Sequence, residues 1–226
     1  MAPKSPVVFL LDVDNTLLDN DRIVRDLHEY TTEQFGEEGM REYWTIFDAM
    51  RAELGYVDYL GSLQRYRIKN PHDHRCLRIS SFLLEYPFKD RIYPGALDVV
   101  RRFQGWGPTV ILTDGDVVLQ PWKIHQAHLS IALKRNVLIY IHKELELANV
   151  EELYPADHYV MVDDKLKILT TMKKIWGDRL TTVFPKQGHY ALDGATLASC
   201  PPADLAVGHI GDLMEFELEA FWGKEP

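Results

Sequence analysis

Short runs of consecutive apolar residues recur along the chain, and each run predicts a β-strand buried on both faces. The runs are rich in β-branched residues and continuous rather than alternating, which is typical of parallel sheets. Helix-length segments such as 119–133 and 165–176 separate the later runs. The runs lie at residues 7–11, 109–112, 137–141, 159–162 and 181–184, with a weaker one at 204–207. We therefore predict an α/β fold, a doubly wound parallel sheet with helices on both faces.

A helical pattern interrupts the predicted strands just after the first one. Its apolar residues are spaced for helices, as where Tyr43, Phe47 and Met50 fall on one helical face. The stretches with this spacing are 21–35, 39–54, 56–68 and 75–86. We predict two units from this change of pattern. Residues 1–19 and 91–226 form the α/β core domain, and residues 20–90 form an inserted helical domain.

The acidic composition narrows the possible partners. The 226 residues include 25 Lys and Arg against 34 Asp and Glu, for a net charge of −9. Such a surface repels nucleic acids and anionic membranes, so we expect neither as a partner. The two cysteines, Cys76 and Cys200, supply neither a disulfide framework nor a zinc-ligand set. With no apolar run near the roughly 18–20 residues that span a bilayer, and no signal peptide, we expect a cytoplasmic protein.

A cluster of polar residues, Asp12-Val13-Asp14-Asn15-Thr16, comes directly after the first predicted strand. Ligands of open parallel sheets bind beyond the carboxyl ends of the strands, where these residues are expected to lie. Two carboxylates at positions i and i+2 can converge on one oxyphilic cation such as Mg²⁺, which would offset their repulsion. The alternative is an Asx turn in which either aspartate only caps the next segment.

Three further polar motifs follow later predicted strands. They are Thr113 with Asp114, then Lys143, then the pair Asp163 and Asp164. Because parallel strands end at one edge of the sheet, we expect all of them near the first motif. In this order, the four motifs resemble those of the haloacid dehalogenase (HAD) superfamily of phosphotransferases, over nearly the whole chain. The resemblance implies a Rossmann-like core and, in the helical insertion, the cap domain of the subclass with an insertion after the first motif.

The resemblance also implies a catalytic role for each motif residue. Asp12 would be the nucleophile that attacks phosphorus, and Asp14 the general acid and base. Thr113 and Asp114 would contact the phosphoryl group, and Lys143 would balance its charge. By the same resemblance, this chain would be a Mg²⁺-dependent phosphatase.

The metal site implied by the resemblance consists of oxygen ligands, as Mg²⁺ prefers. Its ligands would be the Asp12 side chain, the Asp14 backbone carbonyl and Asp164, with Asp163 as a further ligand or behind Asp164. The sequence departs from the longer form of the fourth motif, because no acid follows Asp164 four residues later.

The active-site lysine has a second candidate. Lys123 follows Thr113 by ten residues, within the next predicted helix. Because lysines at such positions are typically solvated helix charges, we assign the role to Lys143 rather than Lys123.

Asp14 separates two reactions of the superfamily. Dehalogenases on this scaffold lack the second aspartate, because cleavage of a carbon–halogen bond needs no such acid. The predicted function is therefore hydrolysis of a small phosphorylated metabolite through an aspartyl-phosphate. The alternatives are a phosphomutase and a non-catalytic binding or regulatory protein. Sugar phosphates, nucleoside monophosphates and phosphoglycolate-like acids remain open as substrates, as does the oligomeric state.

Two other regions are candidates for the walls of the site. Most aromatic residues of the insertion are expected to pack its interior, and one or two to line the pocket. These aromatic residues are Tyr30, Tyr43, Trp44, Tyr56, Tyr59 and Tyr66. The loop 186–190 follows the strand predicted at 181–184, so it too lies at the carboxyl edge and is a candidate flank of the site.

Overall fold

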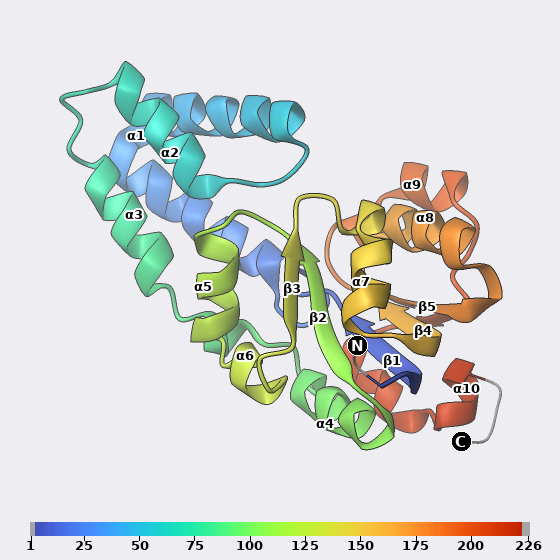
Figure 1. Ribbon diagram of the computed structural model, residues 1–226. Helices are drawn as coiled ribbons and strands as arrows, with labels where there is room; N and C mark the ends of the chain where they lie inside the picture. The colour runs from blue at the N-terminus through green and yellow to red at the C-terminus, as the bar shows by residue number, and fades with distance from the viewer. Residues whose placement is uncertain (1–2, 223–226) are drawn as a thin grey trace.

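The computed structural model describes residues 3–222 and contains a six-stranded parallel sheet (Figure 1). This confirms the predicted sheet and each of its six strands. The strands are β1 (Ser5–Leu11), β2 (Thr109–Asp114), β3 (Val137–Tyr140), β4 (Ala156–Val162), β5 (Leu180–Pro185) and β6 (Leu205–Val207).

The spatial order of the strands is β3-β2-β1-β4-β5-β6. β1 is therefore central, with β2 on one side and β4 on the other, and the chain reverses its direction of travel across the sheet between β3 and β4. In register, Leu11 lies opposite both Ile111 and Val162. Because all strands run the same way, the residues after β1, β2, β3 and β4 meet at one edge, at the topological switch point.

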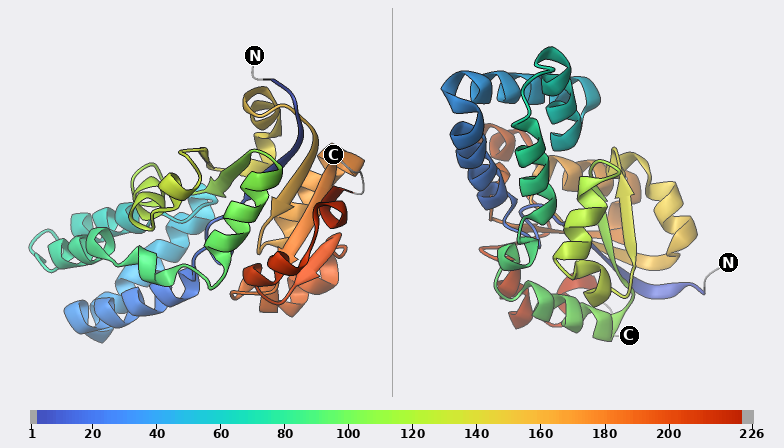
Figure 2. Two further views of the ribbon diagram at one scale, coloured as in Figure 1. Left: turned by 90° about the horizontal axis from the view of Figure 1, so that it is seen from below. Right: turned by 90° about the vertical axis from the view of Figure 1, so that its left-hand side faces the viewer.

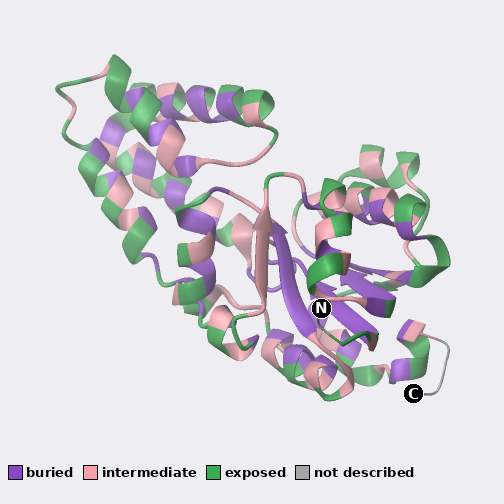
Figure 3. Ribbon diagram, viewed as in Figure 1, coloured by how far each residue is buried: buried purple, intermediate pink, exposed green. Residues whose placement is uncertain are grey.

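Helices cover both faces of the sheet, as predicted. Phe9 of β1 stacks on Phe103 of α4, with ring centroids 4.3 Å apart, and Leu10 belongs to the core on the opposite face. β1, β2, β4 and β5 are accordingly buried along most of their length, whereas the edge strand β3 is only partly buried (Figure 3). One face carries α4 (Ala96–Trp106), α5 (Leu119–Gln126), α6 (Leu129–Ala132) and α10 (Leu218–Trp222). The other carries α7 (Leu147–Leu153) and α8 (Leu166–Trp176), with α9 (Gly194–Ser199) packed on α8.

The helix predicted over 119–133 differs in one respect from the structure. It is divided into α5 and α6, because His128 has a φ of 59° and so leaves the right-handed helical region.

The helical insert, residues 20–85, contains α1 (Asn20–Leu54), α2 (Tyr59–Lys69) and α3 (Cys76–Glu85). Gly36 has φ 71° and ψ 176°, so α1 consists of two helical pieces, as the spacing predicted. Aromatic residues such as Phe35, Tyr43 and Tyr66 pack inside the insert. The insert lies beyond the edge of the sheet to which the β2 and β3 arrowheads point (Figures 1 and 2).

The two chain segments that join the insert to the core run side by side. Leu18 and Ile92 form an antiparallel bridge, and the Asp19 amide donates to the Arg91 carbonyl at 2.8 Å. The boundaries predicted after residues 19 and 90 lie next to this pairing; the division into two domains remains a prediction. Within residues 3–222, none of the helices combines the length and the apolar character needed to cross a membrane.

Candidate active site

The loop after β1 places the first two aspartates at the carboxyl edge of the sheet. The Asp12 amide still donates to the Val162 carbonyl at 3.0 Å, so Asp12 is held like a strand residue. The chain then turns at once, because the Leu17 and Leu18 amides both donate to the Val13 carbonyl at 2.9 Å. Within this turn Asn15 has a φ of 57°, a left-handed conformation that asparagine tolerates better than most residues.

Four strand ends contribute to a buried ionic cluster around Asp12. Lys143 Nζ lies 2.5 Å from Asp12 Oδ1 and 2.6 Å from Asp163 Oδ2. The Thr113 hydroxyl donates to Asp12 Oδ1 at 3.1 Å and accepts from Gln120 Nε2 at 3.1 Å. The structure thus brings together predicted site residues from the ends of β1, β2, β3 and β4.

The charges in this cluster determine each other's protonation. Burial would raise the pKa of Asp12, but the ammonium groups of Lys143 and Lys165 and the hydrogen bonds from Lys143 and Thr113 keep that pKa below its usual range. Burial would likewise lower the pKa of Lys143, and Asp12, Asp163 and Asp114 raise it instead. Both shifts favour the charged forms, an Asp12 carboxylate beside a Lys143 ammonium.

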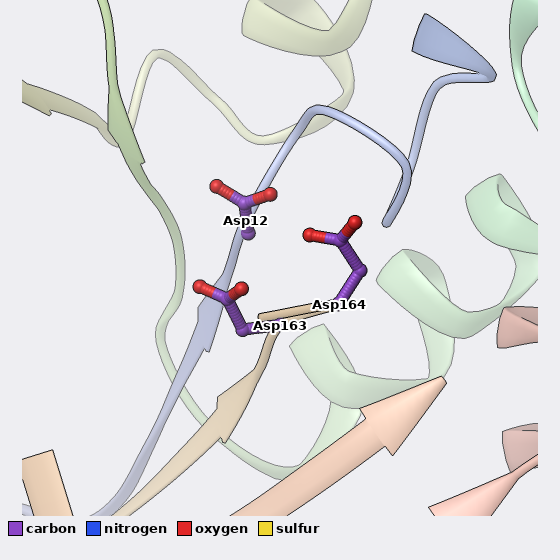
Figure 4. A group of neighbouring side chains, drawn as sticks. All are labelled: Asp12, Asp163 and Asp164. Atoms are coloured by element: carbon purple, nitrogen blue, oxygen red, sulfur yellow. The ribbon is translucent and has the colours of Figure 1, made fainter. Parts of the chain in front are cut away.

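Asp12, Asp163 and Asp164 form a carboxylate trio that fits a divalent cation (Figure 4). Each offers an oxygen within 4.8 Å of the others. Among the described residues, both oxygens of Asp164 and Oδ2 of Asp12 are buried without a hydrogen-bond partner. Buried carboxylate oxygens without partners are costly, and Mg²⁺ is satisfied by such hard oxygen ligands.

The pKa values of the trio also indicate that it fits a divalent cation. Burial, followed by the charges of Asp163 and Asp12, raises the pKa of Asp164. Burial also raises the pKa of Asp163 to about 6. A divalent cation would remove this repulsion and allow all three carboxylates to ionise.

Asp14 points to a different partner, so its side chain does not belong to the trio. Its Oδ1 lies 2.5 Å from Lys123 Nζ, which also lies 3.5 Å from the Asn20 side-chain oxygen. Lys123 is only 3% exposed, so its interpretation as a solvated helix charge was wrong. The candidate site therefore contains two buried lysines, Lys143 paired with Asp12 and Lys123 paired with Asp14.

Asp114 has a structural partner within the site. Its Oδ1 accepts from the Lys143 amide at 2.7 Å, and burial raises the pKa of the carboxyl group. This hydrogen bond fixes the start of the segment that carries Lys143. Contact of Asp114 with a phosphoryl group remains a prediction.

A pocket of about 250 Å³ opens next to Asp14, between the insert and the edge of the sheet. Tyr56 and Tyr59 of the insert line it, which confirms that a minority of the insert's aromatic residues face the site. Tyr190, in the segment after β5, lines it as well, as expected for the 186–190 loop. Residues that the motifs did not reveal also line it, namely Arg51, Gln120 and Lys165.

The comparisons with known proteins agree with this geometry. The model of the haloacid dehalogenase-like hydrolase family matches residues 7–174. A haloacid dehalogenase-like hydrolase of Burkholderia xenovorans LB400 has a similar structure, with 57% sequence identity, a TM-score of 0.92 and coverage of 96% of this chain and 98% of that chain. A search of curated proteins finds no match.

Two more distant structures share the fold alone. L-2-haloacid dehalogenase from Xanthobacter autotrophicus is 16% identical, with a TM-score of 0.61 and coverage of 92% of this chain and 96% of that chain. A magnesium-bound HAD hydrolase of Bacillus subtilis is 14% identical, with a TM-score of 0.63 and coverage of 94% and 98%. The family match and the arrangement of the four motifs lead to one conclusion: the chain belongs to the haloacid dehalogenase-like hydrolases.

Proposed function

We propose that this protein is a Mg²⁺-dependent phosphatase that hydrolyses a small phosphorylated metabolite through an aspartyl-phosphate. The observation that carries the proposal is the Asp14 carboxylate, which lines the pocket two residues after the buried Asp12. A carboxylate there can serve the oxygen leaving group of a phosphate ester, whereas halide departure requires no proton. This distinction favours phosphoryl transfer over dehalogenation, although the L-2-haloacid dehalogenase from Xanthobacter autotrophicus shares the fold.

In the first half of the proposed reaction, the Asp12 carboxylate attacks phosphorus and forms a P–O bond. The bond from phosphorus to the leaving oxygen breaks, and protonated Asp14 gives that oxygen its proton. The ammonium of Lys143, 2.5 Å from Asp12 Oδ1, stays beside the reacting carboxylate throughout. Its positive charge stabilises the negative charge on the transferring group.

In the second half, ionised Asp14 removes a proton from a water molecule that attacks phosphorus. The bond between phosphorus and Asp12 breaks, and inorganic phosphate and the free Asp12 carboxylate result. The ion pair with Lys123 holds the Asp14 carboxylate in place for this step. Bound at Asp12, Asp164 and Asp163, Mg²⁺ would supply positive charge that neutralises the phosphoryl oxygens.

The first test is phosphate release from an aryl phosphate, with Mg²⁺ or with EDTA, by the native protein and by Asp12→Asn. We expect Mg²⁺-dependent release that falls at least about 10³-fold in the variant, since the nucleophile is lost. Asp178→Asn, at an exposed site away from the pocket, is the matched control. Release that survives Asp12→Asn would contradict the proposal.

The two alternatives give different results in the same assay. A phosphomutase would move the phosphoryl group between positions of its substrate without net phosphate release. A binding or regulatory protein would release none from any monoester, even with Mg²⁺ bound. Mass spectrometry of trapped protein would reveal a phosphate adduct on Asp12 for an enzyme but not for a binding protein.

A further inference from the structure

Two cations that line the pocket form no direct ion pair among residues 3–222, although the charge of Asp12 offsets burial and raises the pKa of Lys165. Arg51, near the end of α1 in the insert, donates to the Tyr190 hydroxyl. Lys165, directly before α8 in the core, places its Nζ 5.2 Å from the centre of the Tyr190 ring. Both cations therefore contact the Tyr190 side chain, which carries no charge and so orients them without cancelling their charge.

The acidic residues of the lining have other partners, with one exception. Asp14 is paired with Lys123, and Asp114 accepts from the Lys143 amide. Asp116 accepts from the Val118 and Leu119 amides at the start of α5. The exception is Glu144, whose Oε2 is buried without a partner among the described residues.

Tyr190 belongs to a loop that is firmly attached to the first motif. Gln187 Nε2 donates to the carbonyls of Asn15 and Thr16 at 2.9 and 2.8 Å. His189 Nδ1 lies 2.6 Å from Asp21 Oδ1, and Asp21 begins the insert together with Asn20. The loop thus ties Tyr190 both to the catalytic turn and to the base of the insert.

We propose that Arg51 and Lys165, oriented by Tyr190, select phosphate monoesters whose leaving group carries a second negatively charged group, a carboxylate or another phosphate. This inference rests on the proposed phosphatase function and names its substrate class. The transferring phosphoryl group already has Lys143 and the carboxylate trio's cation site, so Arg51 and Lys165, which make no direct ion pair among the described residues, are available to the other end of the substrate.

The size and remaining polarity of the pocket restrict the substrate further. About 250 Å³ lies below the usual range of roughly 300–1,000 Å³ for pockets that take drug-sized ligands, so the substrate is small. The unpartnered Glu144 oxygen is an acceptor, and it suits a hydroxyl or ammonium group on the same leaving group.

Matched three-carbon substrates test the proposal. 3-Phosphoglycerate differs from glycerol 3-phosphate by a carboxylate in place of a hydroxymethyl group. The bisphosphate of 1,3-propanediol differs from its monophosphate by the second phosphate. We expect kcat/KM at least 10-fold higher for one or both charged members, and the two pairs distinguish a carboxylate from a phosphate as the preferred group.

Substitutions then identify which residues cause the preference for a negatively charged leaving group. Arg51→Met should lower kcat/KM for the preferred charged substrate about 10- to 100-fold, mainly through KM, and change glycerol 3-phosphate little. Lys165→Met also removes a charge that acts on Asp12, so it should lower kcat/KM for both substrates, and more for the charged one. Tyr190→Phe removes the hydroxyl that holds Arg51 and should reproduce part of the Arg51→Met loss. Arg67→Met and Lys167→Met, at exposed positions outside the pocket, are the matched controls and should retain the native preference.

An aryl phosphate assayed in parallel separates two kinds of failure. If Asp12-dependent release from the aryl phosphate persists but charged and neutral substrates react equally, the substrate class is wrong and the phosphatase function stands. If Lys165→Met or Arg51→Met lowers activity equally on every substrate, that residue serves the phosphoryl group and the proposal fails for it. If no monoester releases phosphate with Mg²⁺, the proposed function itself is wrong.

Discussion

The two sides of the pocket are built differently. On the core side, Asp12, Lys143 and Asp163 are buried and ion-paired at 2.5 and 2.6 Å, at the ends of hydrogen-bonded strands. On the insert side, Arg51 is exposed and contacts the core through the Tyr190 side chain. Under the proposed function, the strand ends would hold the reacting groups at fixed spacing, and the insert would contact the rest of the substrate.

Removal of the buried Lys143 ammonium should have the largest effect on stability and activity. Lys143→Met leaves Asp12 and Asp163 without their shared partner, so we expect a loss of about 3–5 kcal/mol in the free energy of unfolding. Phosphate release should fall at least about 10²-fold, since the charge beside the nucleophile is lost. Chemical denaturation and the aryl phosphate assay measure the two effects, with exposed Lys174→Met as the control. Equal losses of stability and of phosphate release in Lys143→Met and Lys174→Met would mean that Lys143 has no special role.

The substitution Asp164→Asn should change the stability of the protein in opposite directions with and without metal. The pKa of Asp164 is raised in the folded protein, so without a cation the native state holds its proton more tightly than the unfolded state does. The contribution of Asp164 to stability therefore falls as pH rises through the acidic range to neutrality. In EDTA at pH 7, Asp164→Asn should be more stable than the native protein by of order 1 kcal/mol, and the difference should vanish near pH 4.

In saturating Mg²⁺ the native protein should instead be more stable than Asp164→Asn. The native protein keeps all three carboxylates of the trio, so it gains more stability by binding Mg²⁺. Thermal unfolding at several pH values, in EDTA and in Mg²⁺, measures both signs. Exposed Asp178→Asn keeps the trio, so its stability should follow that of the native protein in EDTA and in Mg²⁺. An Asp164→Asn variant that Mg²⁺ stabilises as much as the native protein would argue against a cation at the trio.

The smallest expected effect concerns the contact between insert and core at Gly55. Gly55 ends α1 with a φ of 79°, and a Cβ there would lie 2.6 Å from His142 Cε1. Gly55→Ala should cost about 1 kcal/mol of stability through backbone strain, and it should raise KM more than it lowers kcat. In Gly55→Ala/His142→Ala, the KM should recover while the strain remains. Unchanged KM in the single variant would show that this contact does not influence the pocket.

The positions of the polar residues on the core side of the pocket were predictable from local pattern. A continuous apolar run followed by Asp12 and Asp14 predicts a strand end with carboxylates, and Thr113, Lys143 and Asp163 follow their own runs in the same way. Parallel strands carry these ends to one edge whatever the details of packing. For the same reason the six strands and the four helical stretches of the insert were predictable, with boundaries within a few residues; the first two stretches are the two pieces of α1.

The sequence by itself therefore determined the parallel sheet, the place of the insertion and the residues at the strand ends, because each depends on short-range periodicity. Only the tertiary structure decided that Lys123 is buried against Asp14, and that Arg51 and Lys165 share Tyr190. These contacts join residues far apart in the chain. They depend on how α5, α1 and the loop after β5 pack around the pocket, and helical periodicity does not encode such relative positions.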